Sequence, residues 1–348
     1  MTEALQTLAE LGWSPYFQSQ LDLEELETCR PVRVLAVHRG MVEAAGEDGL
    51  ERVLTASRDL NPTAGDWLLL SREDSRPARV LERRSVFKRR AAGPGREIQL
   101  IAANIDTLFV VSSCNQDFNI ARLERYLALA REAEVHPVVV LTKADECSDS
   151  DDYRHRAEAI LPDLMVEVVD ARDTASVQCL SLWCANGQTV ALLGSSGVGK
   201  STLTNTLTGE TAIRTHAARA DDDRGRHTTT GRALHRLAAG GWLLDTPGMR
   251  ELQLIDVADG IDAVFEDIVA LAHDCRFNDC SHEAEPGCAV QAAISDGALT
   301  PDRLKRYRKL ASEERMNRES IAERRARQRS FGKRVAKAMR DKRDRTGF

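Results

Sequence analysis

The chain has 348 residues, of which 42% are hydrophobic and 29% charged, which is ordinary for a globular protein and sufficient for two or three domains. Its net charge of −6 conceals a basic C-terminal segment, since residues 301–348 hold 18 Lys and Arg against 7 Asp and Glu. No apolar run approaches the length of a membrane span, and the acidic, amphipathic N-terminus differs from a signal peptide, so we expect a cytoplasmic protein with no membrane partner.

The N-terminal part of the sequence predicts a helical extension followed by short strands. Residues 1–30 show the pattern of one helix or two. Between about residues 32 and 88, roughly five short β-rich segments are separated by turn residues such as Asn61-Pro62 and Gly65-Asp66. This pattern suits a small barrel of the OB type at residues 31–95, although other small barrels would give the same pattern.

The pattern changes after a Gly/Pro-containing stretch, RRAAGPGREIQL, which predicts a linker. Residues 105–113 and 135–145 contain apolar strands on either side of a helix at about 120–133. DLMVEVVDA is a further strand, and GGWLLDTPG contains the last one. This alternation of strands and helices predicts a parallel α/β domain at residues 96–256.

The stretch LLGSSGVGKST is the strongest single motif in that domain. Gly194, Gly199, Lys200 and Ser201 meet the pattern G-x-x-x-x-G-K-[ST]. In such a loop, backbone N–H groups cradle the phosphates of a nucleotide, Lys200 reaches the β- and γ-phosphates, and the Ser201 hydroxyl ligates Mg²⁺. An apolar strand before the loop and a helix after it, closing at Gly209, argue against a chance glycine-rich turn.

A candidate base reader lies upstream of this loop. TKAD follows an apolar strand and has the form [NT]-K-x-D, in which the carboxylate of Asp145 would accept guanine N1–H and N2–H₂ while the stem of Lys143 packs over the ring. Adenine lacks the paired donors and would leave the carboxylate unsatisfied. The similar DKRD at 341–344 has no strand before it and is rejected.

Two switch motifs come after the phosphate loop. LLDTPG offers Asp245 to hold Mg²⁺ through water and the N–H of Gly248 to sense the γ-phosphate, while GRHTTTG at 225–231 is typical of a mobile switch. Within it, one of Thr228 to Thr230 should complete the Mg²⁺ shell with Ser201 and Asp245, and we choose Thr229. The predicted nucleotide contacts are Thr142, Lys143, Ala144, Asp145, Gly194, Ser195, Ser196, Gly197, Val198, Gly199, Lys200, Ser201, Thr202, Asp245 and Gly248.

The order of these motifs is that of a circularly permuted GTPase: base reader, phosphate loop, first switch, second switch. Such a permutation is tolerable because the termini of compact domains often lie close together. It also has a mechanical consequence. The strand that ends near Gly248 leads almost directly into the C-terminal domain, so a γ-phosphate-dependent movement there would act on that domain.

A metal-ligating pattern comes next, in CRFNDCSHEAEPGC. Cys275, Cys280, His282 and Cys288 have the spacing C-x4-C-x-H-x5-C and form a closed Cys₃His set, which is typical of one structural Zn²⁺. Scattered cysteines are the alternative, and His273 is a rival ligand. Because the other five cysteines of the chain lie in unrelated contexts, we expect reduced thiols rather than a disulfide framework. Residues 257–348 are thus predicted as a zinc-binding helical domain with a basic helix or tail.

Together these motifs resemble the RsgA (YjeQ) family of circularly permuted GTPases that depend on the small ribosomal subunit. The resemblance covers nearly the whole chain and implies a multidomain α+β and α/β fold: an OB-type barrel, a permuted P-loop GTPase domain and a zinc-binding helical domain. It also implies a monomer that hydrolyses GTP to GDP with Mg²⁺, stimulated by the small subunit late in its maturation. The barrel and zinc domain would contact rRNA, and the basic tail, otherwise interpreted as a solvated helix, would then favour RNA.

Two positions depart from common GTPase patterns. Asp170 replaces the small hydroxyl residue expected before Ala171, whose N–H would reach guanine O6. Met249 stands where many GTPases carry a water-orienting Gln, so hydrolysis would rest on Lys200, Thr229 and, as the resemblance suggests, His227, although an exposed loop histidine without a role is the alternative. A nucleotide-gated RNA-binding module and a P-loop kinase or ATPase are the competing functions.

Overall fold

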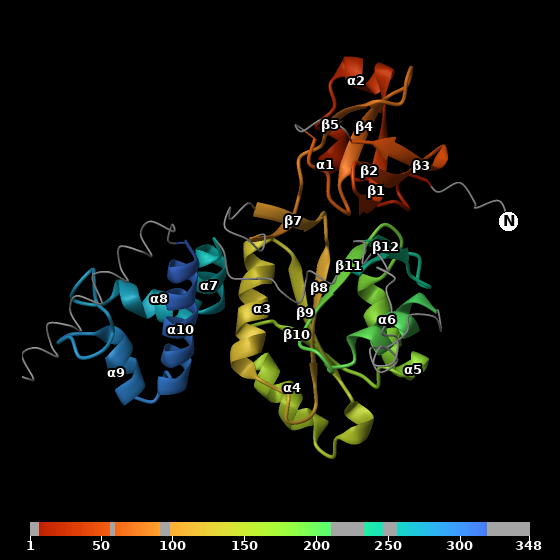
Figure 1. Cartoon of the computed structure of the whole chain (residues 1–348). Helices are drawn as coiled ribbons and strands as arrows, with labels where there is room; N and C mark the ends of the chain where they lie inside the picture. Colours follow the sequence, from red (N-terminus) through yellow and green to blue (C-terminus); the bar gives the residue numbers. More distant parts are fainter. Residues whose placement is uncertain (1–6, 56–59, 91–97, 210–232, 246–255, 319–348) are drawn as a thin grey trace, which may run out of the picture.

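The computed structural model describes residues 7–55, 60–90, 98–209, 233–245 and 256–318 (Figure 1). Three groups of elements succeed one another along the chain: a set of N-terminal strands, a central sheet flanked by helices, and a group of C-terminal helices. No helix among these described residues is both long and apolar enough to cross a membrane.

The N-terminal group begins with two short helices, as the sequence predicts, and continues with antiparallel strands paired in the order β5-β4-β1-β2-β3. Alternate residues of these strands, such as Val32, Val42 and Leu68, are buried in a small apolar core. Since the described pairings do not define a closed barrel, the OB subtype stays a prediction. The elements are α1 (Pro15–Gln18), α2 (Leu23–Thr28), β1 (Cys29–His38), β2 (Met41–Gly46), β3 (Gly49–Leu54), β4 (Trp67–Ser71) and β5 (Pro77–Val80).

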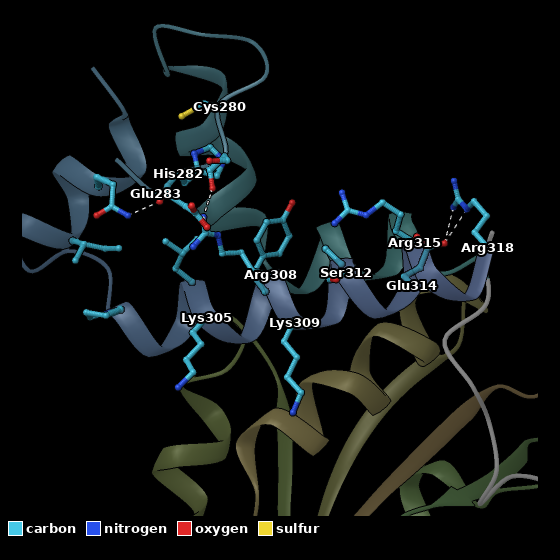
Figure 2. Close-up of a pocket in the computed structure, with 17 residues that line it drawn as sticks. Cys280, His282, Glu283, Lys305, Arg308, Lys309, Ser312, Glu314, Arg315 and Arg318 are labelled. Atoms are coloured by element: carbon cyan, nitrogen blue, oxygen red, sulfur yellow. Dashed lines mark hydrogen bonds and ion pairs between the residues drawn. The ribbon is translucent and has the colours of Figure 1, made fainter. Parts of the chain in front are cut away.

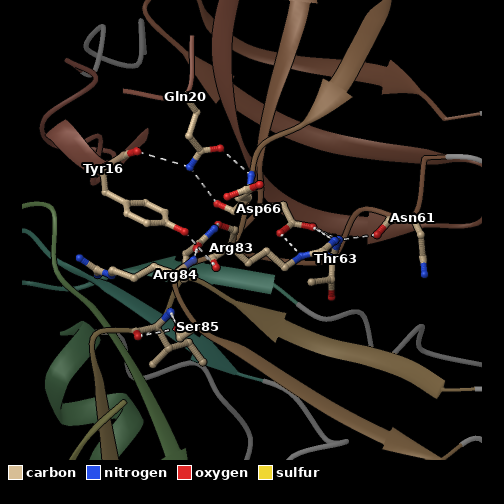
Figure 3. A network of polar contacts seen from close by, with 12 residues as sticks. Tyr16, Gln20, Asn61, Thr63, Asp66, Arg83, Arg84 and Ser85 are labelled. Carbon is tan, nitrogen blue, oxygen red and sulfur yellow. Dashed lines mark hydrogen bonds and ion pairs between the residues drawn. The ribbon is translucent and has the colours of Figure 1, made fainter. Parts of the chain in front are cut away.

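A buried ion pair fixes the chain that leaves these strands (Figure 3). The Asp66 carboxylate is fully buried and accepts hydrogen bonds from Arg83 Nε at 2.7 Å and from the Thr63 N–H at 2.7 Å. Burial raises the pKa of Asp66, and Arg83 opposes that rise. Because Tyr16 Oη donates to the Arg83 carbonyl at 3.3 Å, the same network holds the N-terminal helices.

The prediction of a linker at RRAAGPGREIQL is wrong at both ends of this stretch, which belong to strands. β6 (Val86–Arg90) and β7 (Ile98–Ala103) form an antiparallel hairpin in which Arg89 pairs with Gln99 and Lys88 with Leu100. The residues between them, 91–97, lie outside the described part of the chain. Gly and Pro mark turns of hairpins as well as linkers, so composition alone could not separate the two.

The central sheet confirms the predicted parallel α/β organisation. Its strands lie in the order β10-β9-β8-β11-β13-β12, of which the first five are mutually parallel and β12 is antiparallel. The elements are β8 (Thr107–Ser113), α3 (Ile120–Glu132), β9 (His136–Thr142), α4 (Ser150–Glu158), β10 (Met165–Val168), α5 (Thr174–Val177), β11 (Thr189–Leu193), α6 (Lys200–Thr208), β12 (Ala233–Arg236) and β13 (Trp242–Asp245).

The N-terminal strands are joined to this sheet by two contacts that the sequence did not predict. β12 pairs with β1 at Ala233 and Ala36, so both sets of strands form one continuous sheet. Beside this pairing, Arg33 is fully buried and donates to the Leu11 carbonyl at 2.5 Å and to Thr189 Oγ1 at 2.6 Å. Because Thr189 begins β11, Arg33 connects the N-terminal segment directly to the strand that carries the glycine-rich loop.

The C-terminal helices pack on α3 (Figure 1). They are α7 (Ala258–Val264), α8 (Glu266–His273), α9 (Ala289–Ser295) and α10 (Pro301–Arg318). α7 approaches α3 so closely that a Cβ on Gly260 would lie 2.2 Å from the Ala128 carbonyl oxygen. The Glu124 side chain of α3 is fully buried and binds two cations of α10, with Nε of Arg306 at 2.7 Å and Nη1 of Arg303 at 3.3 Å.

We predict that Glu124→Ala lowers the free energy of unfolding by about 3 kcal/mol, because it removes the buried carboxylate that pairs with Arg306 and leaves Arg303 with Asp267 alone. The matched control is Glu313→Ala, which removes the more exposed partner of Arg125 on α10 and should cost less than about 1 kcal/mol. Urea denaturation measures both variants. An equal loss in the two would contradict the view that Glu124 anchors the C-terminal helices.

Candidate functional site

The glycine-rich loop joins β11 to α6 at the carboxyl edge of the sheet. Gly194 packs against β8, where a Cβ would lie 2.2 Å from the Val111 carbonyl oxygen. Gly199 has φ of +91° and is the N-cap of α6, a conformation that favours glycine. Ser201 and Thr202 lie in the first turn of α6, whose free N–H groups make such a helix end suited to bind phosphate.

Lys200 and Ser195 are held within this loop. Lys200 is buried, and its Nζ donates to the Gly194 carbonyl at 2.8 Å and to the Ser195 carbonyl. Ser195 Oγ donates to Asp117 Oδ2 at 2.5 Å, and Arg122 binds the same carboxylate at 3.0 Å. Hydrogen bonding from Ser195, then Arg122, holds the pKa of Asp117 below its usual value. No sequence motif includes Asp117, which lies in a loop after β8.

The predicted base reader lies beside the phosphate loop. Thr142 ends β9 and is fully buried, and its Oγ1 lies 2.6 Å from the Val198 carbonyl, to which it donates, and 3.0 Å from the Ser112 carbonyl. Lys143 comes next with φ of +60° and leads into the short turn η1 (Ala144–Glu146), which contains Asp145. Two motifs more than fifty positions apart in the sequence are therefore in direct contact.

The Asp145 carboxylate forms an ion pair with Arg172, a residue that the sequence patterns did not single out. Arg172 lies in the loop after β10, the strand parallel to β9. The backbone N–H of Arg172 also donates to Asp170 Oδ1 at 2.9 Å. An exposed arginine in a polar loop matches no sequence motif. Its neighbours Asp170 and Ala171, in contrast, lie at a position where a guanine contact is expected.

The second switch motif begins at the same edge of the sheet. β13 is parallel to β11 and ends at Asp245, so the backbone of Asp245 lies at the carboxyl edge that also carries the glycine-rich loop. His227, Thr229, Gly248 and Met249 lie outside the described residues, and their predicted roles stay predictions.

A second candidate site brings together Cys275, Cys280, His282 and Cys288 between α8 and α9. Their ligand atoms all lie within 4.8 Å of one another. Cys275 and Cys288 sulfurs are 3.9 Å apart, and His282 Nδ1 is 3.6 and 3.5 Å from them. Zn²⁺ with tetrahedral bonds would set these distances at about 3.8 Å between sulfurs and about 3.6 Å between sulfur and nitrogen. The residues therefore fit a zinc ion.

A groove of about 1150 Å³ lies between this cysteine–histidine segment and α10 (Figure 2). Arg308 connects its two sides, since it donates to the Ser281 carbonyl and pairs with Glu283 at 3.1 Å. The groove is lined by more cations than carboxylates, among them Lys305, Arg308, Lys309, Arg315 and Arg318. Its chemistry suits a polyanion.

The fold and the nucleotide-binding edge define a circularly permuted GTPase. A model of the RsgA GTPase family matches residues 80–255. Small ribosomal subunit biogenesis GTPase RsgA 2 of Vibrio parahaemolyticus is 49% identical over 338 residues, covering 97% of this chain and 94% of that protein. Small ribosomal subunit biogenesis GTPase RsgA of Mesorhizobium japonicum is 48% identical, covering 91% and 92%.

Solved structures show the same fold. YjeQ from Thermotoga maritima has a TM-score of 0.61 at 23% identity, covering 84% of this chain and all of that one. YloQ, described as a circularly permuted GTPase, has a TM-score of 0.58 at 21% identity, covering 84% and 97%. The chain belongs to the RsgA family and is a GTP hydrolase.

We predict that the purified protein carries about one Zn²⁺ per chain and that Cys280→Ser loses it. Without the ion the segment after Asp256 should unfold and become sensitive to limited proteolysis. Metal analysis and protease mapping measure the two effects. Cys179→Ser, which changes a cysteine outside the cluster, is the control. A metal-free protein with an intact C-terminal segment would refute the zinc site.

We also predict that Asp145→Asn weakens GTP binding by about 100-fold and favours xanthosine nucleotides, because the amide offers a donor where guanine needs an acceptor. Competition binding of GTP and XTP measures the change in preference. An unchanged preference for guanine would remove Asp145 as the base reader.

Proposed function

We propose that this chain binds the small ribosomal subunit during its maturation and hydrolyses GTP to GDP and phosphate when the subunit stimulates it. The observation that supports this most directly is the Thr142 contact to the Val198 carbonyl, which brings the predicted base reader against the predicted phosphate loop. The names of the relatives supply the ribosomal subunit as partner. A factor that assembles ribosomes would act in the cytoplasm, as a monomer.

In this proposal the phosphate chain of GTP lies on the loop 194–202, where Lys200 moves from its backbone carbonyl partners to the β- and γ-phosphates. Ser201, Asp245 and Thr229 would hold Mg²⁺, which would neutralise phosphate charge. Met249 offers no hydrogen bond that could orient the attacking water, so intrinsic hydrolysis is slow. His227 is the residue proposed to orient the attacking water when the subunit is bound.

The contacts with rRNA would come from the parts that flank the nucleotide site. We propose four regions: a helical extension at 1–30, an OB-like barrel at 31–95, the permuted GTPase domain at 96–256, and a zinc-binding domain at 257–348. The basic groove beside the cysteine–histidine segment supplies positive charge for phosphates, while a structural zinc ion would hold its wall in place. The barrel supplies a second RNA-binding surface.

A structural change between the GTP-bound and GDP-bound states would be transmitted to this groove through α3. That helix packs behind β8 and β9, and its buried Glu124 binds Arg303 and Arg306 of α10. The same α10 lines the groove. GTP would thus favour one arrangement of these helices, and hydrolysis would release the subunit.

We predict that purified small subunits accelerate single-turnover GTP hydrolysis by at least about tenfold, because subunit binding completes a site that lacks a water-orienting Gln. The measurement is the rate of phosphate release with and without subunits, with Lys200→Ala as the inactive control. No acceleration would contradict the proposal and favour a nucleotide-gated RNA-binding module in which hydrolysis is incidental.

A second variant separates RNA contact from chemistry. Lys309→Ala combined with Arg315→Ala, both in the groove lining, should leave intrinsic hydrolysis unchanged and reduce stimulation and the salt dependence of subunit binding. Identical salt dependence in the variant and the unmodified protein would exclude the groove as a contact.

A further inference from the structure

Three charged side chains meet beside the guanine end of the proposed pocket. Arg172 Nη2 binds one oxygen of Asp145, Oδ2, and Arg172 Nε lies 3.5 Å from Asp170 Oδ1. Asp145 comes after β9 and the other two come after β10, its parallel neighbour, so the sheet brings them together. The guanidinium of Arg172 therefore contacts the carboxylates of both Asp145 and Asp170.

The second carboxylate is a feature of this chain. Asp170 occupies a position where a small hydroxyl residue is expected, and it shares the Arg172 guanidinium with Asp145. Two carboxylates that share one guanidinium repel each other, whereas guanine recognition needs the Asp145 carboxylate held in one orientation. The negative charge of Asp145, followed by that of Asp170, raises the pKa of Arg172.

The backbone that carries Arg172 is well anchored. Thr206 of α6 donates its hydroxyl to the Ala171 carbonyl at 2.7 Å, and the Asp170 N–H donates to Ser176 Oγ at 2.9 Å. α6 is the helix that begins at the glycine-rich loop, so the loop that bears Arg172 is fixed to the phosphate site. Arg172 itself is 63% exposed, and an ion pair so exposed adds little to folding stability.

We propose that Arg172 is a positioning residue for guanine recognition, which orients the Asp145 carboxylate and compensates the charge of Asp170. Each carboxylate oxygen has two lone pairs, so Asp145 Oδ2 can accept from Arg172 and from the base together. The inference rests on the proposed role of Asp145 as base reader. It explains how Asp170 is tolerated at the guanine site.

The test is a set of GDP dissociation constants measured by calorimetry at one salt concentration. Arg172→Ala should weaken GDP binding by about tenfold, and Arg172→Lys should recover part of that loss. Asp170→Ser combined with Arg172→Ala should recover most of it, because the second carboxylate is then absent. Arg76→Ala, which breaks an exposed pair with Asp74 in the turn between β4 and β5, is the matched control and should leave GDP binding unchanged. Melting temperatures should be the same in all variants.

Two results would overturn the inference. Tighter GDP binding by Arg172→Ala would make Arg172 a competitor of the base, and unchanged binding would make the pair a surface contact without a role. In the Asp145→Asn background, adding Arg172→Ala should alter XDP binding by less than about twofold, since the carboxylate to be oriented is gone. If Asp145→Asn fails to favour xanthosine, the base-reader proposal fails; if it succeeds while Arg172→Ala is neutral, only the role of Arg172 fails.

Discussion

The nucleotide site depends on one buried hydroxyl. The single O–H of Thr142 lies between the Ser112 carbonyl of β8 and the Val198 carbonyl of the glycine-rich loop, with the shorter distance to Val198, and the side chain has no exposed surface. Removing this buried donor would take away the hydrogen bond that holds the predicted base reader beside the glycine-rich loop. The contact lies between strand ends rather than along the chain, which is why it survives the permuted order of the motifs.

Two further buried charges extend this framework to the flanking parts. Burial lowers the pKa of Arg33 to about 9, yet its hydrogen bonds to Leu11 and Thr189 tie the N-terminal segment to the strand of the phosphate loop. Glu124 does the same on the other side of the sheet, through Arg303 and Arg306. Each charge lies where two elements meet. The sheet that carries the proposed nucleotide site is therefore connected by buried charges to the parts proposed to contact RNA on both sides of it in the chain.

The sequence predicted those elements whose signal is local. β8, β9 and β11 are continuous apolar runs, as buried parallel strands should be, and the cysteine–histidine spacing predicted a cluster that the fold does assemble. β12 was not predicted, because its four residues, which include a histidine, are too few to show the alternation of apolar and polar residues that is typical of a strand. Arg33 was unremarkable, since a charged residue within a strand normally faces water. Arg172 and Asp117 could not be predicted from the sequence, because only the folded sheet brings their loops beside the predicted base reader and the glycine-rich loop.

The cations of α10 illustrate how little a charge count reveals about affinity. Among the described residues, carboxylates already engage four of the seven Lys and Arg of this helix: Arg303, Arg306, Arg308 and Arg318. A cation already neutralised by a carboxylate of the protein displaces few counterions from a phosphate backbone, so it contributes weakly to the ionic-strength dependence of binding. The helix thus divides its positive charge between internal ion pairs and the attraction of a polyanion, and its effective valence toward a polyanion is smaller than its formal charge.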